Sequence, residues 1–508
     1  MSHHTSRRVR ALIMGAALVV AAHPAHAAAA CEGLTALTAS PGGAPLQVTL
    51  AKSVAAGAFT APGPDGPPAA ASPYGSLPAF CRVAITLRPG PKSDVKAEVW
   101  MPASGWNGKL QVVGNGGFAG TIGYRALATA LASGFAAAST DTGHTGPAAN
   151  TFATEDATLD FAYRAIHETA VAAKQAVDGF YGAAPKFSYF NGCSTGGRQA
   201  LTAAQRYPDD FAGIVGGAPA IYTTKQAFGQ LWFYQAIAVG EGAIPKEKLP
   251  LIHDAVLAAC DALDGAADGV LENPLACKFD PGVLACRPGA APASCLTPPQ
   301  VESVRKIYAG ASHAATGEKI FPGLERGSEL GWSPVPVSYA VDYFKHIVFK
   351  NPSWGPSTLN FGSDVAEAYP AAHQIFDAND SRLGAFTSRG GKLLMYQGWA
   401  DPGIPPGHIV NYYAAVKAHT MDAATAVRLF MVPGMGHCGG GDGASSFDMV
   451  AALDKWVERG TAPEQIPASR LRGGKVDRTR PLCAYPRYAR YSGSGSMDDA
   501  SSYSCVEP

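Results

Sequence analysis

The sequence predicts an α/β fold in which a mostly parallel central sheet, flanked by helices, is interrupted by a large inserted domain. Short apolar segments with β-branched residues alternate with helical segments through the first half of the chain, which is typical of a parallel sheet. A long segment rich in Pro, Trp and Cys, with little strand alternation, then follows, and two more strand-like segments come after it. Loops at one end of an α/β sheet accept insertions of this kind.

The N-terminus has the three parts of a secretory signal peptide. The basic run Arg7-Arg8-Val9-Arg10 precedes the apolar stretch 11–22, and Ala25-His26-Ala27 is typical of a cleavage site. The apolar stretch is shorter than the about 20 residues that a membrane-spanning helix needs. We therefore expect residues 1–27 to be removed and the mature protein to be secreted or periplasmic, with no membrane anchor.

The charge balance argues against a polyanionic partner. Lysine and arginine together number 40 and the acidic residues also number 40, which gives a formal net charge of +0 at pH 7. Nucleic-acid-binding proteins usually carry a basic surface. We therefore expect no nucleic acid partner and look for a small-molecule site.

The cysteines indicate a disulfide framework. The chain contains 10 cysteines, and an even number behind a signal peptide is typical of an oxidising export compartment. Zinc binding is the alternative, but the chain has no C-x-x-C pair and its histidines are scattered. Proximity in the sequence favours three bonds, Cys260–Cys277, Cys286–Cys295 and Cys483–Cys505. It leaves four cysteines to assign, Cys31, Cys81, Cys193 and Cys438.

Ser194 lies in the turn of a predicted strand–turn–helix unit. The apolar stretch 187–190 stops at Gly192, and helical residues follow the serine. Gly192, Ser194 and Gly196 match the G-x-S-x-G nucleophile motif, in which small neighbours let a serine occupy a strained turn with its hydroxyl exposed. In a chain with 58 glycines a chance match is the alternative, so the motif needs partners elsewhere in the chain.

A glycine-rich loop at 114–120 follows the predicted strand 109–113. Glycines let backbone N–H groups approach a ligand closely. In α/β-hydrolases a loop at this place supplies one oxyanion donor, and the N–H of the residue after the nucleophile supplies the other. The sequence therefore predicts an oxyanion hole made by Thr195 and Gly117, although an ordinary flexible loop is the alternative.

Two acid–histidine pairs follow predicted strands. Asp141 and His144 precede Ser194, whereas Asp401 and His437 come after it, at the ends of the next-to-last and last predicted core strands. The order along an α/β-hydrolase chain is serine, acid, histidine. We therefore predict a catalytic triad of Ser194, Asp401 and His437, and we interpret Asp141 as a hydrogen-bond acceptor that fixes its own loop.

Cysteines flank both the predicted nucleophile and the predicted base. Cys193 precedes the serine, and Cys438 follows the histidine. A triad would bring these two loops together, so a Cys193–Cys438 disulfide would restrict the geometry on which proton transfer depends. Cys31 and Cys81 then pair by elimination.

Asp261, Asp264 and Asp268 are spaced through a glycine-bent loop of the inserted domain, between Cys260 and Cys277. Ca²⁺ takes about six to eight oxygen ligands, which carboxylates and backbone carbonyls supply. Three carboxylates that converge without a cation would repel one another. The loop therefore favours a structural calcium site over a solvated Asp/Gly turn.

The Cys-Ser, Asp and His-Cys arrangement resembles the tannase/feruloyl esterase family, which also includes the enzyme that hydrolyses mono(2-hydroxyethyl) terephthalate. The resemblance covers nearly the whole mature chain. The segments that carry it are Trp106-Asn107-Gly108-Lys109, the loop 114–120, Gly192 to Gly197, the acidic loop and Gly436-His437-Cys438.

The resemblance implies an α/β-hydrolase core with a lid domain. The change in composition along the chain places the lid at residues 218–388 and the core at residues 28–217 and 389–508. The resemblance also implies a structural calcium ion in the lid. The implied calcium ligands are Asp261, Asp264, Asp268 and the backbone carbonyls of Ala266 and Val270. Some relatives carry an acidic residue at the position of Thr195. The resemblance therefore implies a role as oxyanion donor only for the backbone N–H of this residue and none for its side chain.

The expected function is that of a secreted serine esterase acting on small-molecule esters of aromatic acids through an acyl-enzyme, without a redox cofactor. The resemblance places feruloyl esters first and gallate esters or terephthalate half-esters next. A calcium-stabilised binding protein without catalytic activity is the alternative from another class, and the intact triad counts against it.

Overall fold

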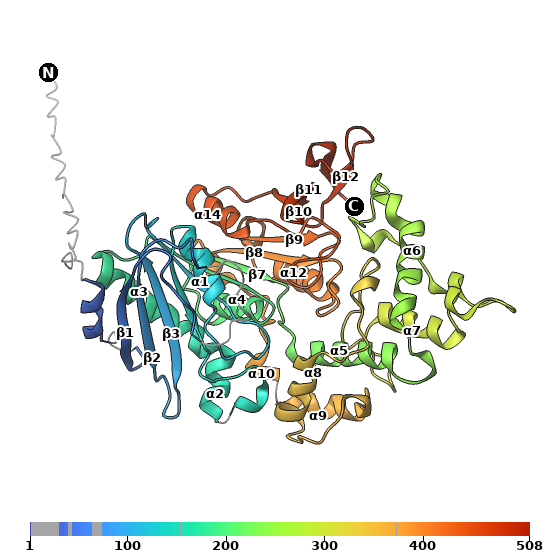
Figure 1. Cartoon of the computed structure of the whole chain (residues 1–508), viewed down its shortest axis with the longest axis horizontal. Helices are drawn as coiled ribbons and strands as arrows, with labels where there is room; N and C mark the ends of the chain where they lie inside the picture. The colour runs from blue at the N-terminus through green and yellow to red at the C-terminus, as the bar shows by residue number, and fades with distance from the viewer. Residues whose placement is uncertain (2–29, 39–42, 63–73, 153, 372) are drawn as a thin grey trace.

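The computed structural model describes residues 1, 30–38, 43–62, 74–152, 154–371 and 373–508 (Figure 1). The predicted signal peptide lies outside the described residues except for Met1. The described strands form a nine-stranded sheet in the order β1-β2-β3-β5-β4-β6-β7-β8-β9. Their bounds are β1 Leu46–Val54, β2 Phe80–Leu87, β3 Val95–Pro102, β4 Lys109–Val113, β5 Ala136–Thr140, β6 Phe187–Cys193, β7 Gly213–Gly217, β8 Lys392–Gly398 and β9 Val427–Val432.

The sheet is mostly parallel, as the sequence predicts. The strands from β5 to β9 run parallel to their neighbours, whereas β1, β2 and β3 form an antiparallel edge. Every residue of β4, β5 and β7 is buried, because helices cover both faces of a parallel sheet. The edge strand β1 is only partly buried.

Helices cover both faces of the sheet (Figure 1). One apolar core contains buried residues of α3, α4 and α12, and a second core on the other face contains those of α1 and α14. The flanking helices are α1 Tyr124–Ala132, α3 Ala165–Tyr181, α4 Thr195–Arg206, α12 Gly407–His419 and α14 Met449–Arg459. The short helix α13, Ala423–Ala426, leads into β9.

An irregular turn precedes helix α3. Helix α2, Glu155–Leu159, ends in a π-helical turn at Asp160–Arg164 before α3 begins. The buried Arg198 side chain on α4 donates hydrogen bonds to the carbonyl oxygens of Phe161 and Ala162 in this turn, at 3.1 and 2.6 Å. In a π turn some backbone carbonyls do not take part in the regular hydrogen bonds of an α-helix. These carbonyls supply the acceptors that a buried guanidinium needs.

The segment between β7 and β8 contributes no strand to the sheet in the described residues, and it lies to the right of and below the sheet in Figure 1. Its side chains form one apolar core of their own and a second core together with Phe118, Phe161 and other residues that precede β7. Phe344, Phe361 and Trp332 are buried in these cores, where they support the lid itself. The helices are α5 Thr223–Ala238, α6 Leu249–Cys260, α7 Pro298–Ala309, α8 Ser338–Asp342, α9 Ser363–Ala371, α10 His373–Phe376 and α11 Gly384–Thr387.

Two small antiparallel sheets near the C-terminus have no counterpart in the sequence prediction. They pair β10 with β11 and β12 with β13. Their bounds are β10 Gln465–Arg472, β11 Lys475–Cys483, β12 Tyr488–Tyr491 and β13 Tyr503–Val506. Most residues of β10 and β11 are partly or fully exposed, and such strands give a weak apolar signal.

Disulfides connect distant parts of the chain. The five bonds in the structure join the same cysteines that the sequence analysis pairs, Cys31–Cys81, Cys193–Cys438, Cys260–Cys277, Cys286–Cys295 and Cys483–Cys505. Cys193 and Cys438 are 245 residues apart in the sequence. Among the helices that the structure describes, none is long and apolar enough to cross a membrane.

Candidate active site

Ser194 occupies a strained turn between β6 and α4. Its backbone dihedral angles are φ 65° and ψ −120°, a combination that costs free energy for a residue with a side chain. A Cβ atom at Gly192 would lie 2.7 Å from the backbone of Gly196, and one at Gly196 would lie 3.1 Å from the carbonyl oxygen of Asn115. The backbone contact therefore requires a glycine at 192, and the tight contact at 196 favours one there, as in a nucleophile turn.

Asp401 and His437 form an acid–histidine pair at the ends of β8 and β9. His437 Nδ1 lies 2.8 Å from Asp401 Oδ2, and Asp401 is fully buried, at 0% exposure. The other carboxylate oxygen accepts hydrogen bonds from the backbone N–H groups of Gly403 and Ile404 at 2.8 and 2.9 Å. These contacts fix the carboxylate and, through it, the orientation of the imidazole.

Gln397 is a supporting residue that the sequence analysis did not single out. Its Nε2 donates to Asp401 Oδ2 at 2.8 Å, the same oxygen that contacts His437. Gln397 is completely buried on β8. The only signal for this role in the sequence is that Gln397 lies near the end of the predicted strand that leads to Asp401.

The surroundings of His437 act on its pKa in opposite directions. Burial alone would lower the pKa, but the hydrogen bond and the negative charge of Asp401 outweigh burial and raise the pKa above the ordinary histidine value. The side chain of His437 is still 35% exposed. A histidine with these properties can accept a proton from a neighbouring hydroxyl group and return it.

The Cys193–Cys438 disulfide connects the serine turn to the histidine loop, with 6.0 Å between the two Cα atoms. It therefore places the residue before Ser194 next to the residue after His437. In the described structure the Ser194 hydroxyl makes no hydrogen bond to His437. Such bonds are often long in a ligand-free enzyme and tighten when substrate binds.

The glycine-rich loop is attached to the start of α4. Gly117 has a positive φ of 52°, and its carbonyl oxygen accepts a hydrogen bond from Thr195 Oγ1 at 2.8 Å. Thr195 is the first residue of α4, so its N–H has no acceptor within the helix. The structure thus brings together the two residues that the sequence analysis proposes for the oxyanion hole.

His144 contacts this loop, whereas Asp141 fixes the loop that contains Asp141 itself. Asp141 Oδ1 accepts hydrogen bonds from the N–H groups of Lys96 and Gly143, both at 2.8 Å. Burial raises the pKa of Asp141 to about 7. His144 Nε2 lies 2.7 Å from the carbonyl oxygen of Phe118. Asp141 has the loop-fixing contacts that the sequence analysis expects, and His144 has a supporting role that it missed.

The three aspartates of the acidic loop all accept backbone hydrogen bonds. Asp261 accepts from Gly269, and Asp264 accepts from the N–H groups of Ala266 and Glu272. Burial, together with the negative charges of its neighbours, raises the pKa of Asp264 to about 6. In the described residues no three acidic, histidine or cysteine side chains form a ready-made metal cluster.

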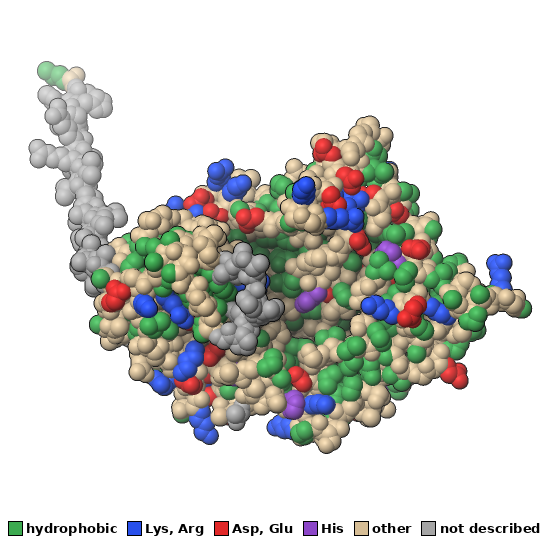
Figure 2. Space-filling view, viewed as in Figure 1, with side chains coloured by type: hydrophobic (Ala, Val, Ile, Leu, Met, Phe, Trp, Pro, Cys, Tyr) green, Lys and Arg blue, Asp and Glu red, His purple; other side chains and the backbone are tan. Residues whose placement is uncertain are grey.

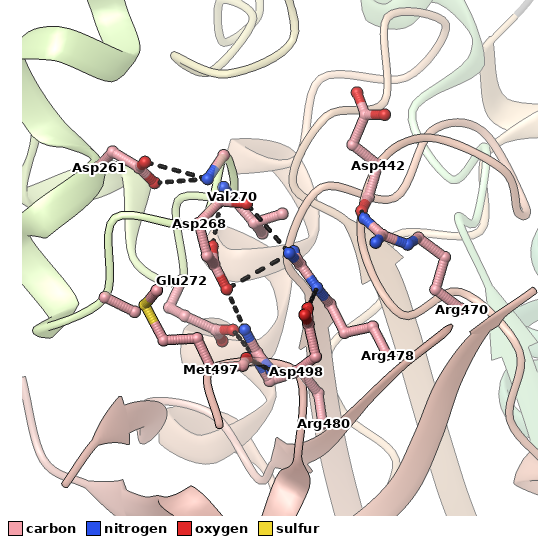
Figure 3. A network of polar contacts seen from close by, with 12 residues as sticks. Asp261, Asp268, Val270, Glu272, Asp442, Arg470, Arg478, Arg480, Met497 and Asp498 are labelled. Atoms are coloured by element: carbon pink, nitrogen blue, oxygen red, sulfur yellow. Dashed lines mark hydrogen bonds and ion pairs between the residues drawn. The ribbon is translucent and has the colours of Figure 1, made fainter. Parts of the chain in front are cut away.

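Arginines from the C-terminal strand β11 contact the acidic loop (Figure 3). Asp268 forms an ion pair with Arg480 and a longer one with Arg478, at 3.5 Å. Arg480 also donates to Glu272 at 3.1 Å. Asp261 and Asp264 have no such cationic partner among the described residues, so the loop retains unpaired negative charge. Its hard oxygen donors and this charge fit a calcium ion.

The fold and the acid–histidine pair define the class of the protein as a hydrolase with an α/β-hydrolase-like core. Residues 81–506 match the family model described as tannase and feruloyl esterase. The chain therefore belongs to the tannase and feruloyl esterase family and is a carboxylic ester hydrolase, which confirms the expected family, fold class and enzyme class.

Individual relatives agree with this assignment. An uncharacterized esterase of Xanthomonas campestris pv. campestris is 40% identical, over 95% of this chain and 92% of its own length. A probable feruloyl esterase B-2 of Aspergillus terreus is 32% identical, over 84% of this chain and 86% of its own. The crystal structure of feruloyl esterase B from Aspergillus oryzae superposes with a TM-score of 0.86 at 31% identity, and covers 94% of this chain and 99% of its own.

The protonation of His437 provides a test of the acid–histidine pair. Because the charge of Asp401 raises the pKa of His437 against the effect of burial, the Asp401→Asn substitution should lower the pKa of this imidazole. NMR titration of the wild-type protein and the variant with isotope-labelled histidine measures the difference. An unchanged His437 titration in a folded Asp401→Asn variant would contradict the pairing.

Proposed function

We propose that this protein hydrolyses esters of phenolic acids with Ser194 as nucleophile, His437 as general base and Asp401 as its carboxylate partner. The single observation that carries the proposal is the disulfide beside Ser194 and His437, which joins the strained serine turn to the loop of a histidine already bonded to a buried carboxylate. These three residues also have the chain order of the α/β-hydrolase triad.

The proposed reaction has two stages. His437 accepts the proton of Ser194, and the serine oxygen attacks the ester carbonyl, while Asp401 holds the imidazole in the required tautomer. The N–H groups of Thr195 and Gly117 stabilise the oxyanion, each by ~3 kcal/mol. The alcohol leaves with the proton from His437. Water, activated by the same histidine, then hydrolyses the acyl-enzyme.

Aromatic side chains next to the oxyanion loop favour the binding of a phenolic acyl group. Phe118 directly follows Gly117, and its ring stacks on Tyr339 of lid helix α8 with 4.1 Å between the ring centroids. Phe118 is buried, whereas Tyr339 is partly exposed. An aromatic acid could therefore pack on a rigid aromatic surface beside its reacting carbonyl.

The names of the relatives favour feruloyl-type esters as substrates. The relatives include proteins named feruloyl esterases, so we place feruloyl esters first and gallate esters second, and terephthalate half-esters are not favoured. Membership in an esterase family counts against the alternative of a binding protein without catalytic activity.

A structural calcium ion is part of the proposal. Asp261, Asp264 and Asp268 with the carbonyls of Ala266 and Val270 would hold it, and it would neutralise the negative charge that the arginines leave. The proposal also includes export, since the five disulfides of the structure are typical of an oxidising compartment.

The Ser194→Ala substitution tests the nucleophile. We expect kcat/KM for methyl ferulate and methyl gallate to fall by about 10⁴-fold or more, because the other triad residues cannot act without the serine. Ser133→Ala, at an exposed serine on the end of α1, is the matched control and should retain activity. Equal turnover by Ser194→Ala and the wild-type protein would refute the serine mechanism.

Calcium removal tests the metal site through stability. We expect a chelator to lower the Tm and added Ca²⁺ to restore it. When the free ion is at about 100 times its Kd, binding should add about 2.7 kcal/mol to the free energy of unfolding. In the Asp264→Asn variant the response of the Tm to Ca²⁺ should disappear. A wild-type Tm that is the same with chelator and with Ca²⁺ would exclude a structural calcium ion.

A further inference from the structure

A cleft of about 290 Å³ lies between the core and the lid domain, whose acidic loop forms part of its wall; the space-filling view shows this face of the molecule hollowed between the two parts (Figure 2). The core contributes His437 and Pro402, the acidic loop contributes Gly269 to Leu271, and the lid contributes His253 and Arg326. Among the described residues that line the cleft are neither Ser194 nor the proposed oxyanion donors. The cleft is therefore in contact with the histidine side of the candidate active site only.

This position identifies the half of the ester that the cleft can hold, given the proposed function on which the inference rests. In a serine esterase the oxyanion donors hold the acyl carbonyl, and the histidine returns its proton to the oxygen of the leaving alcohol. A cleft that includes His437 but excludes Thr195 and Gly117 lies on the alcohol side.

Arg326 brings a fixed positive charge to this cleft. Its Nε and Nη2 donate to the carbonyl oxygen of Phe279 at 3.1 and 2.9 Å, and its guanidinium carbon lies 4.6 Å from the centre of the Tyr308 ring. In the described part of the chain Arg326 forms no ion pair, and its Nη1 has no hydrogen-bond partner. The guanidinium is thus held in place, and its Nη1 hydrogens and the second hydrogen of Nη2 are left for a ligand.

A buried network supports Arg326. The Tyr308 hydroxyl donates to Glu329 Oε1 at 2.7 Å, and His253 Nδ1 lies 2.9 Å from Glu329 Oε2. Glu329 is fully buried at 0% exposure. Burial alone would lower the pKa of His253, but Glu329 outweighs it and raises that pKa. Because the tyrosine, the glutamate and the histidine are already ordered, little conformational entropy is lost when a ligand binds.

We propose that this cleft binds the alcohol half of the ester and that Arg326, with His253 beside it, selects alcohols that carry a carboxylate. A planar guanidinium suits a carboxylate better than other oxygen ligands. The acidic residue among those that line the cleft is Asp442, which is labelled in Figure 3, and Glu325 and Asp280 also lie close enough to Arg326 to interact with its charge. Asp442 is exposed, so solvent screens the repulsion between Asp442 and a ligand carboxylate. The attraction between that carboxylate and the half-buried arginine is screened less.

Three feruloyl esters with matched alcohols test the proposal. One alcohol is 4-hydroxybutanoate, the second is its primary amide, which has the same shape without the charge, and the third is glycerol. The measured quantity is the ratio of kcat/KM for the carboxylate ester to that for the amide ester. We expect the wild-type ratio to exceed one and the Arg326→Gln substitution to lower it by about 10-fold to 100-fold, mainly through KM.

Further variants separate charge from structure. Arg326→Lys keeps the charge but loses the planar fork, so its ratio should be intermediate, and Asp442→Asn should raise the ratio by removing the opposing charge. Arg382→Gln is the matched control, since Arg382 is exposed and paired with Asp380 and does not line the cleft. Its ratio should equal that of the wild-type enzyme.

Two results would overturn the assignment of the cleft but leave the proposed esterase function intact. The first is a wild-type enzyme that hydrolyses all three esters with a carboxylate-to-amide ratio of one. The second is an Arg326→Gln variant that loses as much activity on the glycerol ester as on the carboxylate ester. The second result would mean that the cleft binds neutral polyols. Absence of turnover of every ester by the wild-type enzyme would overturn the proposed function and this assignment together.

Discussion

The Cys193–Cys438 disulfide is the constraint on which the candidate active site depends. Strands β7 and β8 separate β6 from β9 in the sheet, so the sheet alone leaves the serine turn and the histidine loop as independent loops. The bond holds the two backbones 6.0 Å apart at their Cα atoms. It joins Cys438, which has a positive φ of 62°, to the residue before Ser194, whose φ is 65°.

The histidine loop is also supported from the lid and the C-terminal strands. A Cβ atom at Gly434 would lie 3.2 Å from the side chain of Val270 in the acidic loop, and Arg478 and Arg480 of β11 hold Asp268 in the same loop (Figure 3). Three separate parts of the chain therefore meet beside His437. This arrangement explains how a calcium site outside the reaction centre could affect the shape of the cleft next to it.

The parts of this structure that were predictable from the sequence are those set by local patterns. Strand β4 has the bounds that the sequence predicts, Lys109–Val113, because its leucine and valines are typical of a strand buried in the sheet. The serine turn was predictable because close backbone contacts favour the glycines of its motif. The family was predictable from cysteines next to the serine and the histidine.

The parts that were not predictable depend on partners far away in the sequence. The carbonyls of the π turn before α3 accept hydrogen bonds from the buried guanidinium of Arg198. Nothing in residues 158–180 indicates this turn. Gln397 acquires its role only when Asp401 is placed beside it. Arg326 resembles any surface arginine until its contact with Tyr308 and its position in the cleft are known.

The most direct test of the account removes the disulfide and measures turnover. The Cys193→Ala/Cys438→Ala double variant should lose about 10²-fold in kcat at temperatures where circular dichroism shows it folded, because small displacements of reacting groups are costly. The Cys286→Ala/Cys295→Ala variant, which removes a bond within the lid, should retain wild-type kcat. A folded Cys193→Ala/Cys438→Ala enzyme with wild-type kcat would contradict the claim that this bond positions the serine and the histidine.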